Sequence, residues 1–493
     1  MFAARILGPS DLYQNLDQSK TASFTADMVL HGRWALPIDA TGQPSRKPPL
    51  YNWLDAPLFA AGWHSEIALK LPSLLAGLAT IGFTFVAARR VFGRAQWPMA
   101  CAAACIWIAA PENAKHIYFC RPDMLLIALL TAGWLCAMSA LNAPPGKLRT
   151  RWLVAMWVLT GLAVLTKGPA AALIPIYASL HALWIGARTE EGDTQRGIRP
   201  ALRLGWWWGL PTVAAMAAAW LIPAYLQDPQ YVRTGLLGKE MAGRLDASAG
   251  AQTIGARIMA HMRPIMFHVE RFAPWSVLSL AALFMLGPIN RWRAHATVPV
   301  VLWMCMVLGV MTVLAGKGGS YVAPAYPAAA ILAAFALEKV LGGMKVAAGR
   351  RAGIIAGCAL IVGTSISARE VFWSRGARTG TGDAIAQFAR QAGQVVGDDV
   401  VVFDGLGYVP IPTLMGRHQV GAASAELLGR ARWVIMPMRE GLPEASVLSA
   451  ELRRLRAQDG RAVEGSPRIG LWAVDAVPAE ILRGLGTQED GGT

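Results

Sequence analysis

Residues 69–92 read LKLPSLLAGLATIGFTFVAARRVF. As a helix this stretch is long enough to cross the hydrocarbon core of a bilayer, and it runs into the cations Arg89 and Arg90. It therefore predicts a transmembrane helix followed by a basic loop. Further apolar runs lie at 96–111, 122–141, 152–167, 169–186, 205–226, 272–290, 297–315, 321–340 and 352–369. Because 54% of the 493 residues are hydrophobic and only 16% are charged, we predict a polytopic α-helical membrane protein.

Lysine and arginine gather in every second loop between these runs. The basic loops contain Arg89, Arg90 and Arg94; Lys147, Arg149 and Arg151; Arg188, Arg196, Arg199 and Arg203; Arg291 and Arg293; and Lys339, Lys345, Arg350 and Arg351. By the positive-inside rule these loops are cytoplasmic, and residues 1–68, 227–271 and everything after 370 lie on the other side. Topology and anionic lipid headgroups explain the net charge of +15, so we expect membrane lipids and no nucleic acid as partners.

The chain divides into three predicted parts. Residues 1–68 form an outer, periplasmic loop in which 49–62 is too short to span and is expected to be interfacial. Residues 69–370 form a transmembrane domain of about ten helices. Because no span precedes residues 1–68 to carry them across the membrane, we expect a first transmembrane helix that this sequence lacks.

Residues 371–493 form the third part, where the composition becomes more polar. The segments 400–404, 433–437 and 470–475 are typical of buried strands, and 382–392 and 444–457 have helical patterns. We therefore predict a small soluble α/β domain on the periplasmic side, ending in a disordered tail.

Two lysines stand directly before helix-breaking residues on the predicted outer side. They are Lys47 in Lys47-Pro48-Pro49 and Lys167 in Lys167-Gly168-Pro169. A lone interfacial lysine can simply extend its ammonium to the headgroups, but a lysine fixed beside proline is suited to hold a phosphate. Lys20, Arg271 and Lys317 lie on the same predicted side and would complete an anion site.

The same side carries two acids and a histidine with more than one interpretation. Asp17 lies in a polar loop and is either a helix cap or a base that deprotonates an acceptor hydroxyl. Asp123 begins a predicted span, where it either complements the helix dipole or faces a shared site. His268, close to Trp275, is either a headgroup-level side chain or part of that site, and no spacing typical of a metal centre surrounds it.

The order of these elements resembles the polyprenyl-phosphate-sugar-dependent membrane glycosyltransferases of the GT-C fold. The matching elements are Asp17; Lys47-Pro48-Pro49-Leu50 with Trp53; Lys70-Leu71-Pro72-Ser73; Arg121-Pro122-Asp123; Thr166-Lys167-Gly168-Pro169; His268 with Arg271; and Lys317 followed by Tyr321 and Pro324. The likeness covers about residues 10–370. It is strongest to the lipid A aminoarabinose transferase branch, which is related to protein O-mannosyltransferases.

The resemblance implies an inverting glycosyltransferase at the periplasmic face of the bacterial inner membrane. It would move a sugar from a polyprenyl-phosphate donor to lipid A, another glycan or a protein. By position, Asp17 and Asp123 match the first and second acids of the family, which implies catalytic roles. The implied substrate- and phosphate-binding residues are Lys20, Lys47, Lys167, His268, Arg271, Lys317 and Tyr321.

The sequence departs from the family pattern at two positions. Gln18 follows Asp17 where the family usually has Glu, and Arg46 precedes Lys47 where the family has Glu. The second difference removes an acid associated with metal binding in relatives, so we predict no metal and no cofactor. It also leaves the sugar and the acceptor open.

A transporter or flippase for lipid-linked substrates is the alternative. Transporters often contain repeats and broken helices that meet near the middle of the membrane. Here the polar residues gather at one face and the sequence contains no internal repeat, which favours the enzyme.

Overall fold

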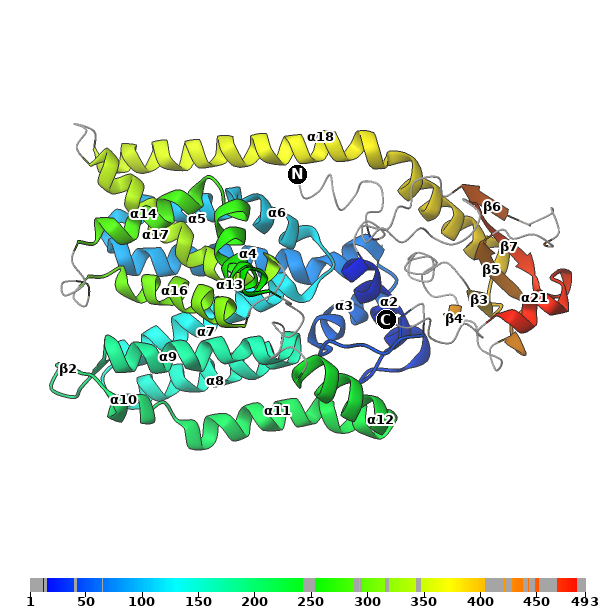
Figure 1. Cartoon of the computed structure of the whole chain (residues 1–493), viewed down its shortest axis with the longest axis horizontal. Coiled ribbons are helices and arrows are strands. Elements are labelled where there is room, and N and C mark those ends of the chain that lie inside the picture. The colour runs from blue at the N-terminus through cyan, green and yellow to red at the C-terminus, as the bar shows by residue number, and fades with distance from the viewer. Residues whose placement is uncertain are drawn as a thin grey trace.

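The computed structural model is a bundle of long helices with a smaller, partly β region at one end (Figure 1). It describes residues 12, 16–39, 42–63, 65–242, 253–287, 292, 295–314, 319–342, 347–403, 420–422, 428–437, 442, 448–451 and 468–485. The predicted disordered tail and Lys317 lie outside the described residues.

Every apolar run predicted as a span overlaps a helix. The bundle contains α4 (Ser65–Phe92), α5 (Trp97–Ala109), α7 (Pro122–Asn142), α8 (Lys147–Lys167), α9 (Leu173–Trp184), α11 (Trp206–Gln227), α14 (Trp275–Met285), α16 (Val298–Val313), α17 (Tyr326–Leu341) and α18 (Ala348–Val396). Within the described residues, five helical segments are long and apolar enough to cross a membrane: Glu66–Phe92, Pro122–Asn142, Lys147–Trp184, Ile198–Gln227 and Gly319–Leu341. The prediction of a polytopic helical fold is confirmed.

Aromatic and small side chains fill the centre of the bundle. The indole rings of Trp134 in α7 and Trp303 in α16 stack with centroids 5.3 Å apart, and the Tyr177 ring of α9 meets both edge-on. All three side chains are fully buried. Because each of these rings comes from a different helix, the contacts fix three helices against one another.

Close helix contacts depend on glycine at some crossings. Gly209 in α11 faces the buried ring of Trp157 in α8, and a Cβ at this position would lie 2.2 Å from that ring. The indole Nε1 of Trp157 donates to the Leu204 carbonyl oxygen at 2.8 Å, so the ring cannot easily move away.

Gly209→Ala is therefore expected to destabilise the protein by about 1–3 kcal/mol, the usual penalty for overpacking. The measurement is thermal unfolding of the purified protein in detergent. Gly82→Ala in α4 is the matched control, because a Cβ there meets no atom within 4 Å. Equal melting temperatures for the two variants would contradict the packing argument.

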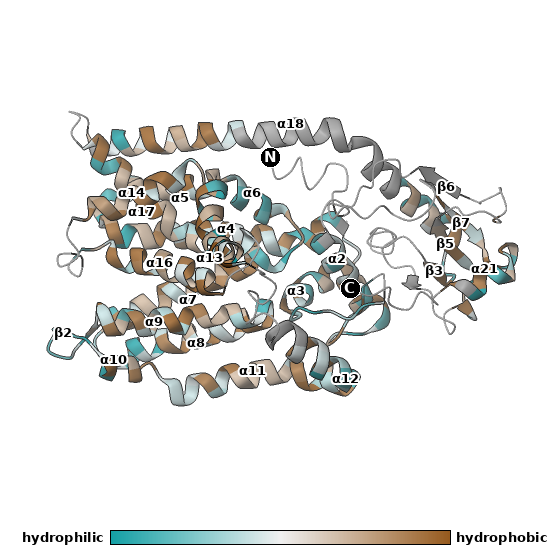
Figure 2. Ribbon diagram, viewed as in Figure 1, coloured by the Kyte–Doolittle hydropathy of each residue, from teal (hydrophilic) through white to brown (hydrophobic). Residues whose placement is uncertain are grey.

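Two short helices lie at one end of the bundle, opposite the end that carries β2 (Thr194–Gln195) and α10 (Ile198–Leu202) (Figure 1). They are α2 (Leu16–His31) and α3 (Leu50–Ala60), so the predicted interfacial segment 49–62 is a helix. Residues of α2 and α6 (Pro111–Tyr118) are largely hydrophilic, whereas the long helices are mainly hydrophobic (Figure 2). We call the end with α2 and α3 the polar end.

The loop between α2 and α3 is folded back onto α2 and the bundle. Asp27 of α2 accepts from the Ile38 amide at 2.9 Å and pairs with Arg33 at 3.0 Å. Trp220 of α11 donates to the Ala35 carbonyl oxygen at 2.9 Å. These contacts fix the loop that leads into the Lys47-Pro48-Pro49 element.

The long helix α18 connects the bundle to a five-stranded sheet of order β4-β3-β5-β7-β6 (Figure 1). The strands are β3 (Val401–Phe403), β4 (Val420–Ala422), β5 (Trp433–Pro437), β6 (Leu448–Glu451) and β7 (Arg468–Ala473). β3 pairs parallel with β4 and β5, while β7 pairs antiparallel with β5 and β6.

The sheet confirms three predicted strands and corrects one predicted helix. Segments 400–404, 433–437 and 470–475 correspond to β3, β5 and β7, and the helix at 382–392 is part of α18. The helix predicted at 444–457 is wrong for the part that the structure describes, because Leu448–Glu451 is a strand that pairs with β7. Backbone pairing at the open edge of the sheet outweighed a helical pattern in the sequence.

Candidate active site

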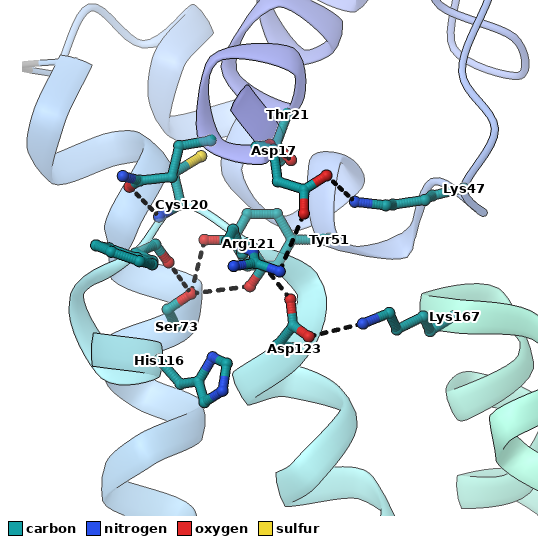
Figure 3. Close-up of polar contacts among 12 residues, drawn as sticks. Asp17, Thr21, Lys47, Tyr51, Ser73, His116, Cys120, Arg121, Asp123 and Lys167 are labelled. Carbon is teal, nitrogen blue, oxygen red and sulfur yellow. Dashed lines mark hydrogen bonds and ion pairs between the residues drawn. The ribbon is translucent and has the colours of Figure 1, made fainter. Parts of the chain in front are cut away.

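Five charged side chains of alternating sign form a continuous row at the polar end (Figure 3). Lys47 Nζ lies 2.9 Å from Asp17 Oδ1, and the other oxygen of Asp17 lies 3.0 Å from Arg121 Nη2. Arg121 Nε is 3.1 Å from Asp123 Oδ2, and Asp123 Oδ1 is 2.6 Å from Lys167 Nζ. We call Lys47, Asp17, Arg121, Asp123 and Lys167 the charge row.

The charge row joins parts of the chain that are distant in sequence. Asp17 is in the first turn of α2, Lys47 precedes α3, and Arg121 and Asp123 flank the start of α7. Lys167 is the last residue of α8. Of the residues predicted to share a site, the structure thus brings Asp17, Lys47, Asp123 and Lys167 together.

Solvent access is greater at the Lys47 and Asp17 end of the row than at the Asp123 and Lys167 end. The Asp17 and Lys47 side chains are 43% and 29% exposed, whereas those of Lys167 and Asp123 are 8% and 2% exposed. Three cations face two carboxylates, so the row has an excess of positive charge. A ligand from outside would therefore reach the Asp17 and Lys47 end first.

The charge of Asp17 is stabilised by its neighbours. Burial raises the pKa of its carboxyl group, but the positive charges of Lys47 and Arg121 outweigh this effect and hold the pKa below its ordinary value. Asp17 is therefore an ionised hydrogen-bond acceptor at neutral pH.

The backbone around Lys47 is held in place. The buried Ser45 hydroxyl donates to the Lys47 carbonyl oxygen at 3.0 Å and accepts from the Lys47 amide at 3.3 Å. Pro48 and Pro49 follow and restrict the next two φ angles. The backbone at Lys47 is thus held in place.

Lys167 is placed by a reversal of the chain between α8 and α9. Gly168 has φ +62, in the left-handed region that glycine adopts most easily. The short helix η3 (Gly168–Ala172) follows and turns the chain into α9. The Lys167 ammonium also lies 4.5 Å from the centre of the Tyr321 ring, a cation–π contact that brings this predicted site residue beside the charge row.

Arg271 and His268, both in α13 (Ile254–Arg271), have other partners. Arg271 Nη1 lies 2.8 Å from Glu112 Oε1. His268 is fully buried, its Nε2 lies 3.2 Å from the Ser279 hydroxyl, and its ring stacks on Phe272. Burial lowers the pKa of His268 to about 4, so its ring is neutral at neutral pH.

Lys20 lies one helical turn beyond Asp17 on α2 and is half-buried. Sequence reasoning placed Arg121 on the predicted outer side but gave it no role in the site, and it did not name Glu112. In the structure Arg121 is the centre of the charge row. The available signal was the Arg121-Pro122-Asp123 triplet, in which a cation and an acid stand on either side of a helix-initiating proline.

Within the described ranges, no group of three or more His, Cys, Asp or Glu side chains has the arrangement of a metal site.

This arrangement combines an exposed carboxylate with fixed cations. Lysine and arginine at the exposed end can bind the oxygens of a phosphate, while the adjacent Asp17 can accept a proton or a hydrogen bond. The chemistry suited to such a site is attack of a hydroxyl group on a phosphate-activated carbon.

The known proteins that this chain is similar to are membrane glycosyltransferases. The profile of the dolichyl-phosphate-mannose-protein mannosyltransferase family matches residues 46–194. The undecaprenyl phosphate-alpha-4-amino-4-deoxy-L-arabinose arabinosyl transferase of Pseudomonas aeruginosa is 25% identical over 339 residues, which cover 66% of this chain and 56% of that protein. The protein of the same name from Shewanella sediminis is 21% identical, with 74% and 63% covered. The matches thus span less than two thirds of these relatives' own lengths.

Two solved structures share the architecture. ArnT from Cupriavidus metallidurans in the apo state matches with a TM-score of 0.63 and 17% identity, over 85% of this chain and 88% of that one. Its complex with undecaprenyl phosphate matches with a TM-score of 0.60 and 18% identity, over 83% and 82%. These similarities confirm the resemblance predicted from the sequence, and the chain is an integral membrane protein of GT-C fold.

Proposed function

We propose that this chain is an inverting glycosyltransferase that moves a sugar from a polyprenyl-phosphate donor to a hydroxyl acceptor. The reaction would take place at the periplasmic face of the bacterial inner membrane. The charge row is the observation that carries the proposal, because it holds an ionised carboxylate and several cations in one fixed group. The basic loops at the opposite end of the bundle support the assignment of the polar end to the periplasm.

The donor phosphate binds at the exposed end of the row. Lys47 is more exposed than Lys167, and its ammonium can move from the Asp17 carboxylate to a phosphate oxygen. Lys20 and Arg271 are further candidate cations, and Lys317 keeps this role as a prediction from the sequence. Positive charge at this position stabilises the negative charge that develops on the departing polyprenyl phosphate.

Asp17 acts on the acceptor. The acceptor oxygen forms a bond to the anomeric carbon while the bond from that carbon to the phosphate oxygen breaks. The electron pair leaves with the polyprenyl phosphate, and the hydroxyl proton passes to the Asp17 carboxylate. A single displacement of this kind inverts the configuration at the anomeric carbon.

Asp123 contributes through its neighbours. Its carboxylate is 2% exposed and lies between Arg121 and Lys167, so it is enclosed by protein. We assign it the task of holding these two cations in position. Tyr321 supports the same arrangement from the side, because its ring faces the Lys167 ammonium.

The relatives narrow the class of donor. Their names specify undecaprenyl phosphate carrying 4-amino-4-deoxy-L-arabinose, so an undecaprenyl-phosphate-linked amino sugar or pentose is the first donor to test. The acceptor is lipid A, another glycan or a protein.

The deciding experiment compares bacterial envelopes with and without the gene. Mass spectrometry of glycolipids and glycoproteins should show one sugar modification that disappears on deletion, and membranes containing the protein should restore it with a lipid-linked donor. Identical envelopes and no transfer from any polyprenyl-phosphate sugar would refute the proposal.

Lys47→Ala is expected to raise the KM for the lipid-linked donor about 10–100-fold, because a hydrogen bond to a charged group contributes about 1.5–3 kcal/mol. Lys47→Arg keeps the charge and should lose less. The control is Lys339→Ala, which removes a lysine close to the C-terminal end of α17, on the predicted cytoplasmic side. Steady-state kinetics in membranes provide the measurement, and an unchanged donor KM for Lys47→Ala would exclude the phosphate role.

A further inference from the structure

The turn between α6 and α7 is held at three consecutive backbone positions. We call Phe119, Cys120 and Arg121 the Arg121 turn. Ser73 Oγ in α4 lies 2.7 Å from the Phe119 carbonyl oxygen and 3.2 Å from the Arg121 carbonyl oxygen. The amide of Cys120 donates to Gln18 Oε1 at 2.9 Å. Bonds on three adjacent residues leave this turn little freedom to shift.

The hydroxyl of Tyr51 supports the contact made by Ser73. Tyr51 donates to the Leu69 carbonyl oxygen at 2.8 Å, and its oxygen lies 2.9 Å from Ser73 Oγ (Figure 3). Both side chains are buried, with Tyr51 1% and Ser73 0% exposed. The helix that follows Lys47 is therefore connected to the turn that carries Arg121.

Gln18 connects the turn to the catalytic carboxylate more directly. It is fully buried and is the residue next to Asp17 on α2. The Cys120 amide that it accepts from is next to Arg121, whose guanidinium lies 3.0 Å from Asp17. One side-chain bond thus ties together the two backbone segments that carry this ion pair.

We propose that Gln18 is a positioning residue: its amide oxygen holds the Arg121 turn against α2 and thereby keeps the Arg121 guanidinium on the Asp17 carboxylate. The effect on catalysis rests on the proposed function, whereas the effect on the turn concerns the fold of the site alone.

Two variants test this role. Gln18→Ala removes the acceptor and adds no charge, so hydrogen–deuterium exchange of the Cys120 amide should be at least about 10-fold faster than in the wild type, while Gln18→Glu should keep it slow. With the loss of alignment, kcat of Gln18→Ala should fall about 10–100-fold at every pH.

Gln18→Glu is the rescue variant, because a carboxyl oxygen can accept the same hydrogen bond from the Cys120 amide. Its kcat should therefore stay close to the wild-type value, although the substitution changes the charge.

Gln227→Ala is the control for the exchange experiment. Gln227 also bonds to the backbone of the N-terminal region, through the Leu36 amide and carbonyl at 3.2 and 3.1 Å, but it does not bond to the Arg121 turn. Its loss should leave the exchange of the Cys120 amide as slow as in the wild type.

Unchanged Cys120 exchange in Gln18→Ala would overturn the positioning role. Faster exchange with a wild-type kcat would overturn its effect on catalysis. If the wild type transfers no sugar, the proposed function fails, while the exchange experiment still decides whether Gln18 holds the turn. If Gln18→Ala does not fold, Gln18→Asn, which has a shorter amide, should show the faster exchange.

Discussion

Asp17→Asn is expected to lower the rate of sugar transfer by about 10²–10⁴-fold, the usual contribution of a general base. Asparagine keeps the shape of the side chain but cannot take the acceptor proton. It also loses the negative charge that pairs with Lys47 at 2.9 Å and Arg121 at 3.0 Å. The assay is transfer in membranes from a lipid-linked donor, with the amount of folded protein measured in parallel.

Asp228→Asn is the matched control for this variant. The Asp228 carboxylate caps α12 (Pro229–Tyr231) by accepting from the Tyr231 amide at 2.8 Å, and asparagine caps helices equally well. This control should transfer at the wild-type rate. Wild-type activity in Asp17→Asn would exclude Asp17 as the base.

The pKa shift of Asp17 predicts where acid should reduce activity. Since Lys47 and Arg121 lower its pKa, the carboxylate stays ionised at and somewhat below the ordinary value of 3.8. Its contribution to stability is present above the unfolded pKa and is lost as the pH falls through the lower, folded one. In a plot of kcat/KM against pH, the fall in activity that protonation of Asp17 causes should therefore lie below pH 3.8 in the free protein.

Asp123→Ala is expected to have the largest effect on stability. The carboxylate is 2% exposed and lies 2.6 Å from Lys167 and 3.1 Å from Arg121, whose side chains are 8% and 13% exposed. Removing one member of such a buried pair costs about 3–5 kcal/mol, because it leaves the remaining charge uncompensated. Thermal unfolding in detergent should show a large fall in melting temperature.

A second substitution tests whether the uncompensated charge causes the loss of stability. Lys167→Met in the Asp123→Ala background removes one of the uncompensated charges and should restore part of the stability. Glu338→Ala serves as the comparison, because its partner Arg351 is 16% exposed and more accessible to water than Lys167. If Asp123→Ala has the same melting temperature as the wild type, the charge row does not stabilise the protein.

The sequence predicted the helices well because their signal is local. A run such as 69–92 must form a helix in a bilayer, since only a helix satisfies its own backbone groups there. The C-terminal region was harder, because sheet partners are distant in sequence. The segment around Leu448–Glu451 shows this, since its strand state depends on pairing with Arg468–Ala473.

For the site, the sequence by itself predicted the candidate residues and the membrane side on which they lie. That prediction rested on the positions of Asp17, Lys47, Asp123 and Lys167 beside helix ends, prolines and a glycine. Only the tertiary structure decided their pairing: Arg121 joins both acids, and Arg271 pairs with Glu112. The reason is physical, because an ion pair depends on distances of a few ångströms between segments that lie up to 159 residues apart in the chain.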